Sequence, residues 1–345
     1  MKKHSLAHSF LALVLCLAMI LPLIPVPAKA AALENYDTGS DYSGVNFSFI
    51  GDSISTYYGI TNSSTYNPLY LTTSEATFGT YYGNTSHGDY AEFSSVKWED
   101  TWWKQAVDTL GGNLLVNNAW SGSFVLSDQG QSNTTEYGAA AYKDRCVNLH
   151  YGSKMPDIIG VFLGTNDIAY YGSMDVGTYA DVDTVSERTA LFSGVNKFST
   201  PSSSIEAYYI MISRMVAKYP DAEIYCLLPT ICQNTMGSGR INALNDFNAG
   251  VKYIVDYYAS QGKKVYLVDL TTNSGLVDNV TVRNYYYCNN VHPSVAGMDW
   301  ITTNLINEIM EHSQKGVGQS QIHEVTYQLD EVLAVEGLTR WAVEG

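Results

Sequence analysis

The segment Phe49-Ile50-Gly51-Asp52-Ser53-Ile54-Ser55 carries an apolar run into a glycine, an aspartate and a serine. Upstream of it, Val45, Phe47 and Phe49 alternate with polar residues, which predicts a buried strand that stops at a tight turn. Open α/β sheets bind their ligands at the carboxyl ends of such strands. A Gly-Asp-Ser tripeptide also suits an ordinary turn, so the interpretation of Ser53 depends on the rest of the chain.

Three further blocks follow in a fixed order. They are Asn118-Ala119-Trp120-Ser121-Gly122, Gly164-Thr165-Asn166-Asp167 and Val291-His292-Pro293. With the first segment, these blocks resemble the SGNH hydrolases, the GDSL-type branch of esterases and lipases, over roughly Val45 to Ser313. The resemblance implies an α/β fold, a three-layer α/β/α sandwich around a five-stranded parallel sheet of the flavodoxin-like kind.

The resemblance also implies a role for one residue in each block. Ser53 would be the nucleophile, and His292 the base that accepts its proton and returns it to the leaving alcohol. The backbone N–H groups of Ser53 and Gly122 and the side-chain amide of Asn166 would form the oxyanion hole. Losing one such donor costs about 3–4 kcal/mol of transition-state stabilisation.

Three neighbouring residues receive supporting roles. Ser55 is the rival nucleophile, and we expect it to be a helix N-cap instead. We expect Asp52 and Asp167 to brace their turns through hydrogen bonds to the backbone.

The chain departs from the family pattern before the histidine. The orienting acid of the family stands three residues upstream, and here that position is Asn289. Its amide oxygen would accept from the imidazole Nδ1–H of His292 without adding charge, so the catalytic set is Ser53, His292 and Asn289. The pKa of His292 should then be lower than in a relative with aspartate at this position. Asp278 is an alternative orienting residue, and a catalytically weak relative that only binds carbohydrate is an alternative protein class.

The alternation of strands and helices along the chain supports the same fold. Predicted strands are Val45–Ile50, Leu114–Asn117, Ile158–Leu163, Glu223–Leu228 and Lys264–Val268. Predicted helices are Trp98–Leu110, a segment capped by Ser203 and Glu206 that ends before Pro220, Ile241–Ala259 and Met298–Met310.

The first 30 residues read as a secretory signal peptide, with a basic start, an apolar run and an Ala28-Lys29-Ala30 cleavage site. Removing its three lysines lowers the formal net charge from −15 to −18, which argues against nucleic acid and anionic membrane as partners. We therefore expect a secreted protein, cleaved near Ala30, without a stable membrane anchor.

The domain organisation follows from these limits. After the signal peptide come an N-terminal segment (31–44), the hydrolase domain (45–313) and a linker with an acidic tail (314–345) to which the sequence assigns no role. Residues 61–97 are too long for an ordinary connection, and their tyrosines favour a binding lid over a disordered insert.

For the substrate, we expect an acyl group on a carbohydrate, acetyl first. Aromatic residues beside the blocks suit sugar stacking, and the candidates are Tyr57, Trp120 and Tyr170. A short- or medium-chain lipase-like esterase is the alternative. Neither a metal nor a cofactor is implied, because no metal-ligand motif occurs.

Four cysteines follow the signal peptide, and an exported protein permits disulfides. We expect Cys232 to pair with Cys288, because both lie at the predicted active-site edge. Cys146 and Cys226 should then stay reduced and buried.

Overall fold

The computed structural model describes residues 41–56, 69–70, 96, 99–120, 122–126, 140–141, 145–169, 175–184, 186, 188, 201–230, 238–271, 286–287 and 291–316. Several sequence predictions lie outside these residues. They are the signal peptide, most of the long segment 61–97, the acidic tail beyond 316, and the pairing of Cys232 with Cys288.

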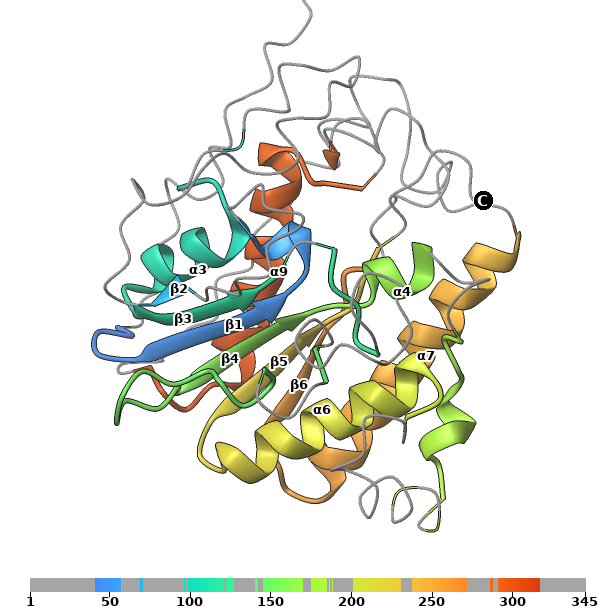
Figure 1. Ribbon diagram of the computed structural model, residues 1–345. Helices are drawn as coiled ribbons and strands as arrows, with labels where there is room; N and C mark the ends of the chain where they lie inside the picture. Colours follow the sequence, from blue (N-terminus) through green and yellow to red (C-terminus); the bar gives the residue numbers. More distant parts are fainter. Residues whose placement is uncertain are drawn as a thin grey trace, which may run out of the picture.

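A six-stranded sheet forms the centre of the fold (Figure 1). Five strands run parallel, namely β1 (Asn46–Gly51), β3 (Asn113–Ala119), β4 (Ile158–Phe162), β5 (Glu223–Leu227) and β6 (Val265–Val268). The order is β2-β3-β1-β4-β5-β6, and its parallel part is the flavodoxin-like order. The five-stranded parallel sheet predicted from the sequence is therefore confirmed. The added β2 (Leu69–Tyr70) pairs antiparallel with β3 and is too short to leave a periodic signal.

Two hydrophobic layers cover the two faces of the sheet, as the alternation of side chains along β1 requires. Phe47 and Phe49 pack in one layer with α3 (Trp102–Leu110) and α9 (Val295–His312). Ile50 points the other way, into the layer formed with α6 (Ser204–Lys218) and α7 (Ser238–Ser260). This arrangement is the predicted three-layer sandwich.

Capping side chains account for where α6 and α9 begin. The Ser203–Glu206 capping box is confirmed: Ser203 Oγ accepts from the N–H of Glu206, and the Glu206 carboxylate accepts from the N–H of Ser203. Helix α3 starts at Trp102 rather than at the predicted Trp98, with Thr101 as its N-cap. Helix α9 starts at Val295, three residues before the predicted Met298, because Ser294 Oγ accepts from the N–H of Gly297.

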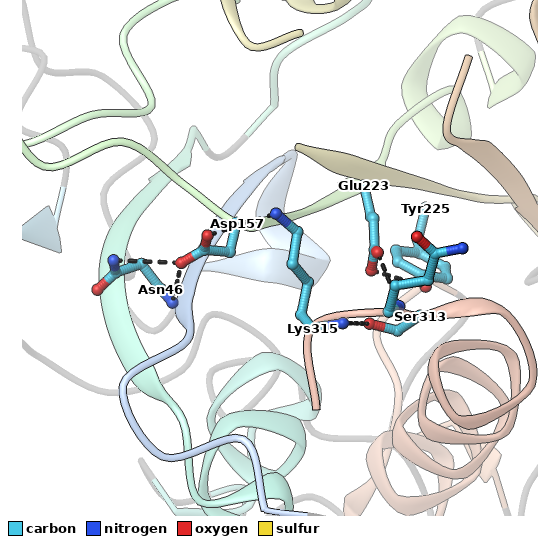
Figure 2. Close-up of polar contacts among 7 residues, drawn as sticks. Asn46, Asp157, Glu223, Tyr225, Ser313 and Lys315 are labelled. Carbon is cyan, nitrogen blue, oxygen red and sulfur yellow. Dashed lines mark hydrogen bonds and ion pairs between the residues drawn. The ribbon is translucent and has the colours of Figure 1, made fainter. Parts of the chain in front are cut away.

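The chain after α9 is fixed at the amino-terminal edge of the sheet (Figure 2). The buried carboxylate of Glu223 accepts from the N–H of Gln314 at 2.9 Å. Lys315 Nζ lies 3.6 Å from Asp157 Oδ1, and the other oxygen of Asp157 accepts from the N–H of Asn46. Because the strands are parallel, this edge is the one opposite Ser53, so the contacts secure the fold away from the candidate site.

Two buried cysteines are free, as predicted for Cys146 and Cys226. Burial raises the pKa of each thiol to about 12, so both remain protonated at neutral pH. In the part of the chain that the structure describes, no helix combines the length and the apolar character needed to cross a bilayer.

Candidate active site

The nucleophile candidate lies in a tight turn at the carboxyl end of β1. Ser53 opens the 3₁₀ helix η1 (Ser53–Ser55), and Asp52 is its N-cap. Asp52 Oδ1 accepts from the N–H of Ile54 at 3.0 Å, which confirms that Asp52 braces this turn. The turn places Ser53 at the sheet edge where ligands bind in open α/β folds.

Ser55 is not a helix N-cap, so that prediction was wrong. It is the last residue of η1, fully buried against Gly51, and a Cβ at Gly51 would lie 2.2 Å from its Oγ. The N-cap rule chose the wrong polar residue: the short helix begins earlier, and Asp52, one position before it, accepts from the N–H of Ile54. The contact of His292 Nε2 with Ser53 Oγ favours Ser53 over Ser55 as the nucleophile.

His292 meets Ser53 across 239 positions of sequence. Its Nε2 lies 2.9 Å from Ser53 Oγ, and both side chains are buried. This distance is within hydrogen-bond reach, which a general base needs for the proton that it removes. The sequence-predicted pair is therefore brought together.

The histidine is held by the segment that leads into α9. Tyr287 and Pro293 form an antiparallel bridge, and the N–H of Ser294 donates to the carbonyl of Tyr286 at 2.9 Å. Gly297 permits this approach, because a Cβ there would lie 2.0 Å from the same carbonyl oxygen. Backbone pairing between residues before and after His292 holds the main chain in place at the histidine.

Burial lowers the pKa of His292 from 6.5 to about 4. The imidazole is therefore neutral at neutral pH, and its Nε2 can accept the hydroxyl hydrogen of Ser53. The sequence predicted a low pKa for want of a carboxylate partner, whereas the cause found is burial. Asn289 and its alternative, Asp278, lie outside the described residues.

The two remaining blocks lie beside this pair. Gly122 follows β3 with φ 74°, a conformation that favours glycine, and Asn166 lies in the short helix α4 (Thr165–Ala169) after β4. Asn166 Nδ2 donates to the carbonyl of Ser123 at 3.0 Å. This bond ties the amide side chain to the loop that contains Gly122.

Asp167 was predicted to brace its own turn, and it instead holds the neighbouring loop after Gly122. Its carboxylate accepts from the N–H of Val125 at 3.0 Å and from the hydroxyl of Ser204 at 2.6 Å. Burial raises the pKa of Asp167, and it raises that of Asp52 to about 7. The nearby carboxyl group of Asp167 also raises the pKa of Asp52 by repulsion, whereas the Arg145 cation lowers it.

Arg145 is a residue of this site that the sequence did not reveal. Its side chain is buried, and its guanidinium donates to the carbonyl of Gly51 at 2.8 Å and to Ser123 Oγ at 3.1 Å. The guanidinium also lies 6.0 Å from the ring centroid of Trp120, a substrate-binding candidate. The partners of Arg145 are mainly backbone carbonyls, which leave no motif in the sequence.

The other sequence-predicted site residues are placed as follows. Trp120 directly follows β3 and is half-buried. Its backbone N–H donates to the carbonyl of Gly51 at 3.0 Å. Tyr57 and Tyr170 lie outside the described residues. Within the described ranges, one group has metal-ligand spacing, Glu308, Glu311 and His312, at the far end of α9 from Ser53.

Comparison with known proteins places the chain in an esterase family. A family model for GDSL-like lipase/acylhydrolase matches residues 45–261. No curated protein matches the chain.

Solved structures with a similar fold include two carbohydrate esterases. A family two carbohydrate esterase from Clostridium thermocellum, in complex with cellohexaose, is 20% identical with a TM-score of 0.45; the match covers 77% of this chain and 64% of that one. A family 2 carbohydrate esterase with a carbohydrate-binding domain, from Corynascus thermopiles, is 19% identical with a TM-score of 0.48, over 78% of this chain and 66% of that one. This chain thus spans about two thirds of the length of either esterase.

A putative GDSL-like lipase from Bacteroides uniformis is 22% identical with a TM-score of 0.44, and the match covers 76% of this chain and 93% of that one. The family model is the finding that assigns the chain, since it extends over more than half of its residues. The chain belongs to the GDSL-like lipase/acylhydrolase family, whose class of reaction is the hydrolysis of carboxylic esters.

Proposed function

We propose that the protein is a secreted serine esterase that removes acyl groups, acetyl first, from carbohydrates. The observation that carries the proposal is the 2.9 Å contact between Ser53 Oγ and His292 Nε2 at the carboxyl edge of the sheet. A buried serine and a buried, neutral histidine at this distance have the geometry of a nucleophile and its base.

The first half of the reaction forms an acyl-enzyme. Ser53 Oγ attacks the ester carbonyl carbon while His292 Nε2 takes the hydroxyl proton, and the carbonyl oxygen becomes an oxyanion. The tetrahedral intermediate then collapses. The bond to the sugar oxygen breaks, and His292 returns the proton to that oxygen, so the alcohol leaves neutral.

The second half repeats these steps with water. His292 takes a proton from a water molecule as the water oxygen attacks the acyl carbon. Collapse breaks the bond to Ser53 Oγ, which regains the proton, and the carboxylic acid is released. No group besides ester and water is consumed.

The oxyanion requires preorganised donors in a site that excludes water. We assign this role to the backbone N–H groups of Ser53 and Gly122 and to the amide of Asn166. An amide nitrogen carries two hydrogens, and the bond from Asn166 Nδ2 to the Ser123 carbonyl occupies one of them while orienting the group. Asn289 is proposed as the acceptor for the Nδ1–H of His292, with Asp278 as the alternative.

The substrate class rests on the sequence. The signal peptide, the tyrosine-rich polar segments and Trp120 next to the Gly122 loop favour a carbohydrate ester over a long acyl chain. Tyr57 and Tyr170 complete the proposed sugar contacts. A short- or medium-chain esterase, or a carbohydrate-binding protein without turnover, is the alternative that the Asn289 substitution keeps open.

The test uses the chain without residues 1–30, a chromogenic acetyl ester, and a panel of acetylated glycans set against medium-chain esters. Ser53→Ala should abolish turnover without loss of the fold, and Ser55→Ala, matched in residue type and two positions away, should retain most of it. Wild-type turnover in Ser53→Ala, or binding of acetylated glycan with no ester cleaved, would contradict the proposal. Sequencing the N-terminus of the protein from culture medium tests cleavage near Ala30.

A further inference from the structure

Arg145 stands apart from the other basic residues that the structure describes, because it alone among their arginines and lysines is fully buried. A buried guanidinium loses its hydration and requires replacement partners. Its Nη2 donates to the carbonyl of Gly51 at 2.8 Å, to Ser123 Oγ at 3.1 Å and to the carbonyl of Asn118 at 3.4 Å. These partners belong to two different blocks of the site.

The carbonyl of Gly51 is where the blocks join. It accepts from Arg145, from the N–H of Trp120 at 3.0 Å and from Ser123 Oγ at 3.4 Å. Gly51 stands two residues before the nucleophile Ser53, whereas Trp120 and Ser123 flank Gly122. Arg145 thus connects the turn that carries the nucleophile to the loop that carries the second oxyanion donor.

The third donor is attached to the same assembly. Ser123, whose hydroxyl contacts Arg145, accepts from Asn166 Nδ2 through its carbonyl at 3.0 Å. The position of Arg145 is fixed in return, since Asn118 Nδ2 donates to the Arg145 carbonyl at 3.0 Å. All three proposed oxyanion donors are therefore within a few covalent or hydrogen bonds of one guanidinium.

A neighbouring carboxyl group interacts favourably with the buried positive charge of Arg145. The buried carboxyl group of Asp52 interacts with the Arg145 cation, which lowers the pKa of Asp52 against the effect of burial. The three bonds to Gly51, Ser123 and Asn118 all leave from Nη2, which lies one bond farther along the side chain than a lysine ammonium would, so a lysine would not reach the same acceptors.

We propose that Arg145 is a positioning residue for ester hydrolysis, which sets the separation between the Ser53 turn and the Gly122–Ser123 loop. The proposal rests on the proposed esterase function. It predicts that loss of the guanidinium misplaces donors that act in the transition state more than groups that bind the ground state. Such a loss lowers kcat and leaves KM nearly unchanged.

The experiment compares Arg145→Met, Arg145→Lys and the control Arg214→Met in the chain without residues 1–30. Arg214 is the matched control because it also donates to a backbone carbonyl of the neighbouring segment, that of Ala141. The measurements are kcat and KM for a chromogenic acetyl ester well below the melting temperature, together with the melting temperature itself. Arg145→Met should lower kcat about 100-fold, with KM within about threefold.

Arg145→Lys separates charge from geometry. It keeps the positive charge, so it should recover most of the lost thermal stability, but its shorter side chain should leave kcat at least about tenfold below wild type. Arg214→Met should lose stability while keeping kcat near wild type.

Other outcomes overturn the positioning role. One is a folded Arg145→Met with wild-type kcat, and another is a fall in kcat/KM that Arg214→Met shares equally. Full recovery of kcat by Arg145→Lys would also overturn it, as would failure of both Arg145 variants to fold, which would make Arg145 a folding residue. Absence of turnover in the wild type would contradict the esterase function instead, so the two failures are distinguishable.

Discussion

Burial of His292 makes a quantitative prediction for the pH dependence of catalysis. As the proposed base, His292 works only when it is neutral, and its pKa is lowered from 6.5 to about 4. With a pKa near 4, about 90% of the imidazole is neutral at pH 5, whereas an unperturbed histidine would be only about 3% neutral. We therefore expect kcat/KM at pH 5 to stay close to its plateau.

The assay is kcat/KM for a chromogenic acetyl ester between about pH 3.5 and about pH 8, read at a wavelength where both forms of the leaving group absorb equally. Ser53→Ala supplies the uncatalysed background at each pH. Tryptophan fluorescence, followed in parallel, shows that the fold persists where activity is measured. An acidic limb centred at pH 6 or above in folded enzyme would refute the reasoning, because His292 would then carry its ordinary pKa.

The same pKa shift links His292 to stability. Between pH 6.5 and about 4, His292 is protonated in the unfolded chain and neutral in the native state. The free energy of unfolding therefore falls as the pH falls through this window. The full loss is on the order of 3 kcal/mol. Asp52 works in the opposite direction, since its native carboxyl stays protonated up to about pH 7 and its contribution is lost as pH rises from 3.8. Asp52→Asn should remove this opposing term in chemical denaturation at a series of pH values.

Three further predictions concern packing and charge. Gly51→Ala should destabilise the fold by about 1–3 kcal/mol in denaturant unfolding, because its Cβ would lie 2.2 Å from Ser55 Oγ, and adding Ser55→Gly should recover part of the loss; no recovery would contradict this contact. Glu223→Leu should lower the free energy of unfolding by about 1–3 kcal/mol by leaving the N–H of Gln314 without its acceptor, with kcat unchanged because the residue lies at the opposite edge of the sheet; a fall in kcat at full stability would be inconsistent with that. Asn289→Asp should move the acidic limb of kcat/KM upward by about one pH unit or more, and an unmoved limb would show that another residue orients His292.

Much of the fold could be predicted because its elements repeat a simple pattern. The strands β4 and β5 are apolar runs buried on both faces, and the long helices carry a wide apolar stripe with recognisable caps. The elements that were missed are short. β2 has two residues and α4 has five, and neither length allows a period to be counted. Helix ends shifted where a side chain such as Ser294 captured an N–H group one turn earlier than the apolar pattern begins.

In the candidate site, the parts that depend on residue type could be predicted, and the parts that depend on backbone contacts could not. Ser53 and His292 were visible because nucleophile and base chemistry require particular side chains, and the structure brings them to 2.9 Å. The misassigned Ser55 and the unforeseen Arg145 both depend on Gly51: Ser55 occupies the space of its missing Cβ, and Arg145 binds its carbonyl. Neither relation has a sequence signature, because a glycine offers only backbone.

Gly51, two residues before the proposed nucleophile, therefore has two separate physical requirements. One is steric, since any Cβ there collides with Ser55, and the other is polar, since three donors converge on its carbonyl oxygen. Gly51→Ala tests the first requirement and Arg145→Met tests the second. Because the two substitutions affect different atoms of Gly51, the ratio of lost stability to lost kcat should differ between them. If both variants lost stability and kcat in the same ratio, the support around Ser53 would act only through folding, and the distinction drawn between packing and positioning would fail.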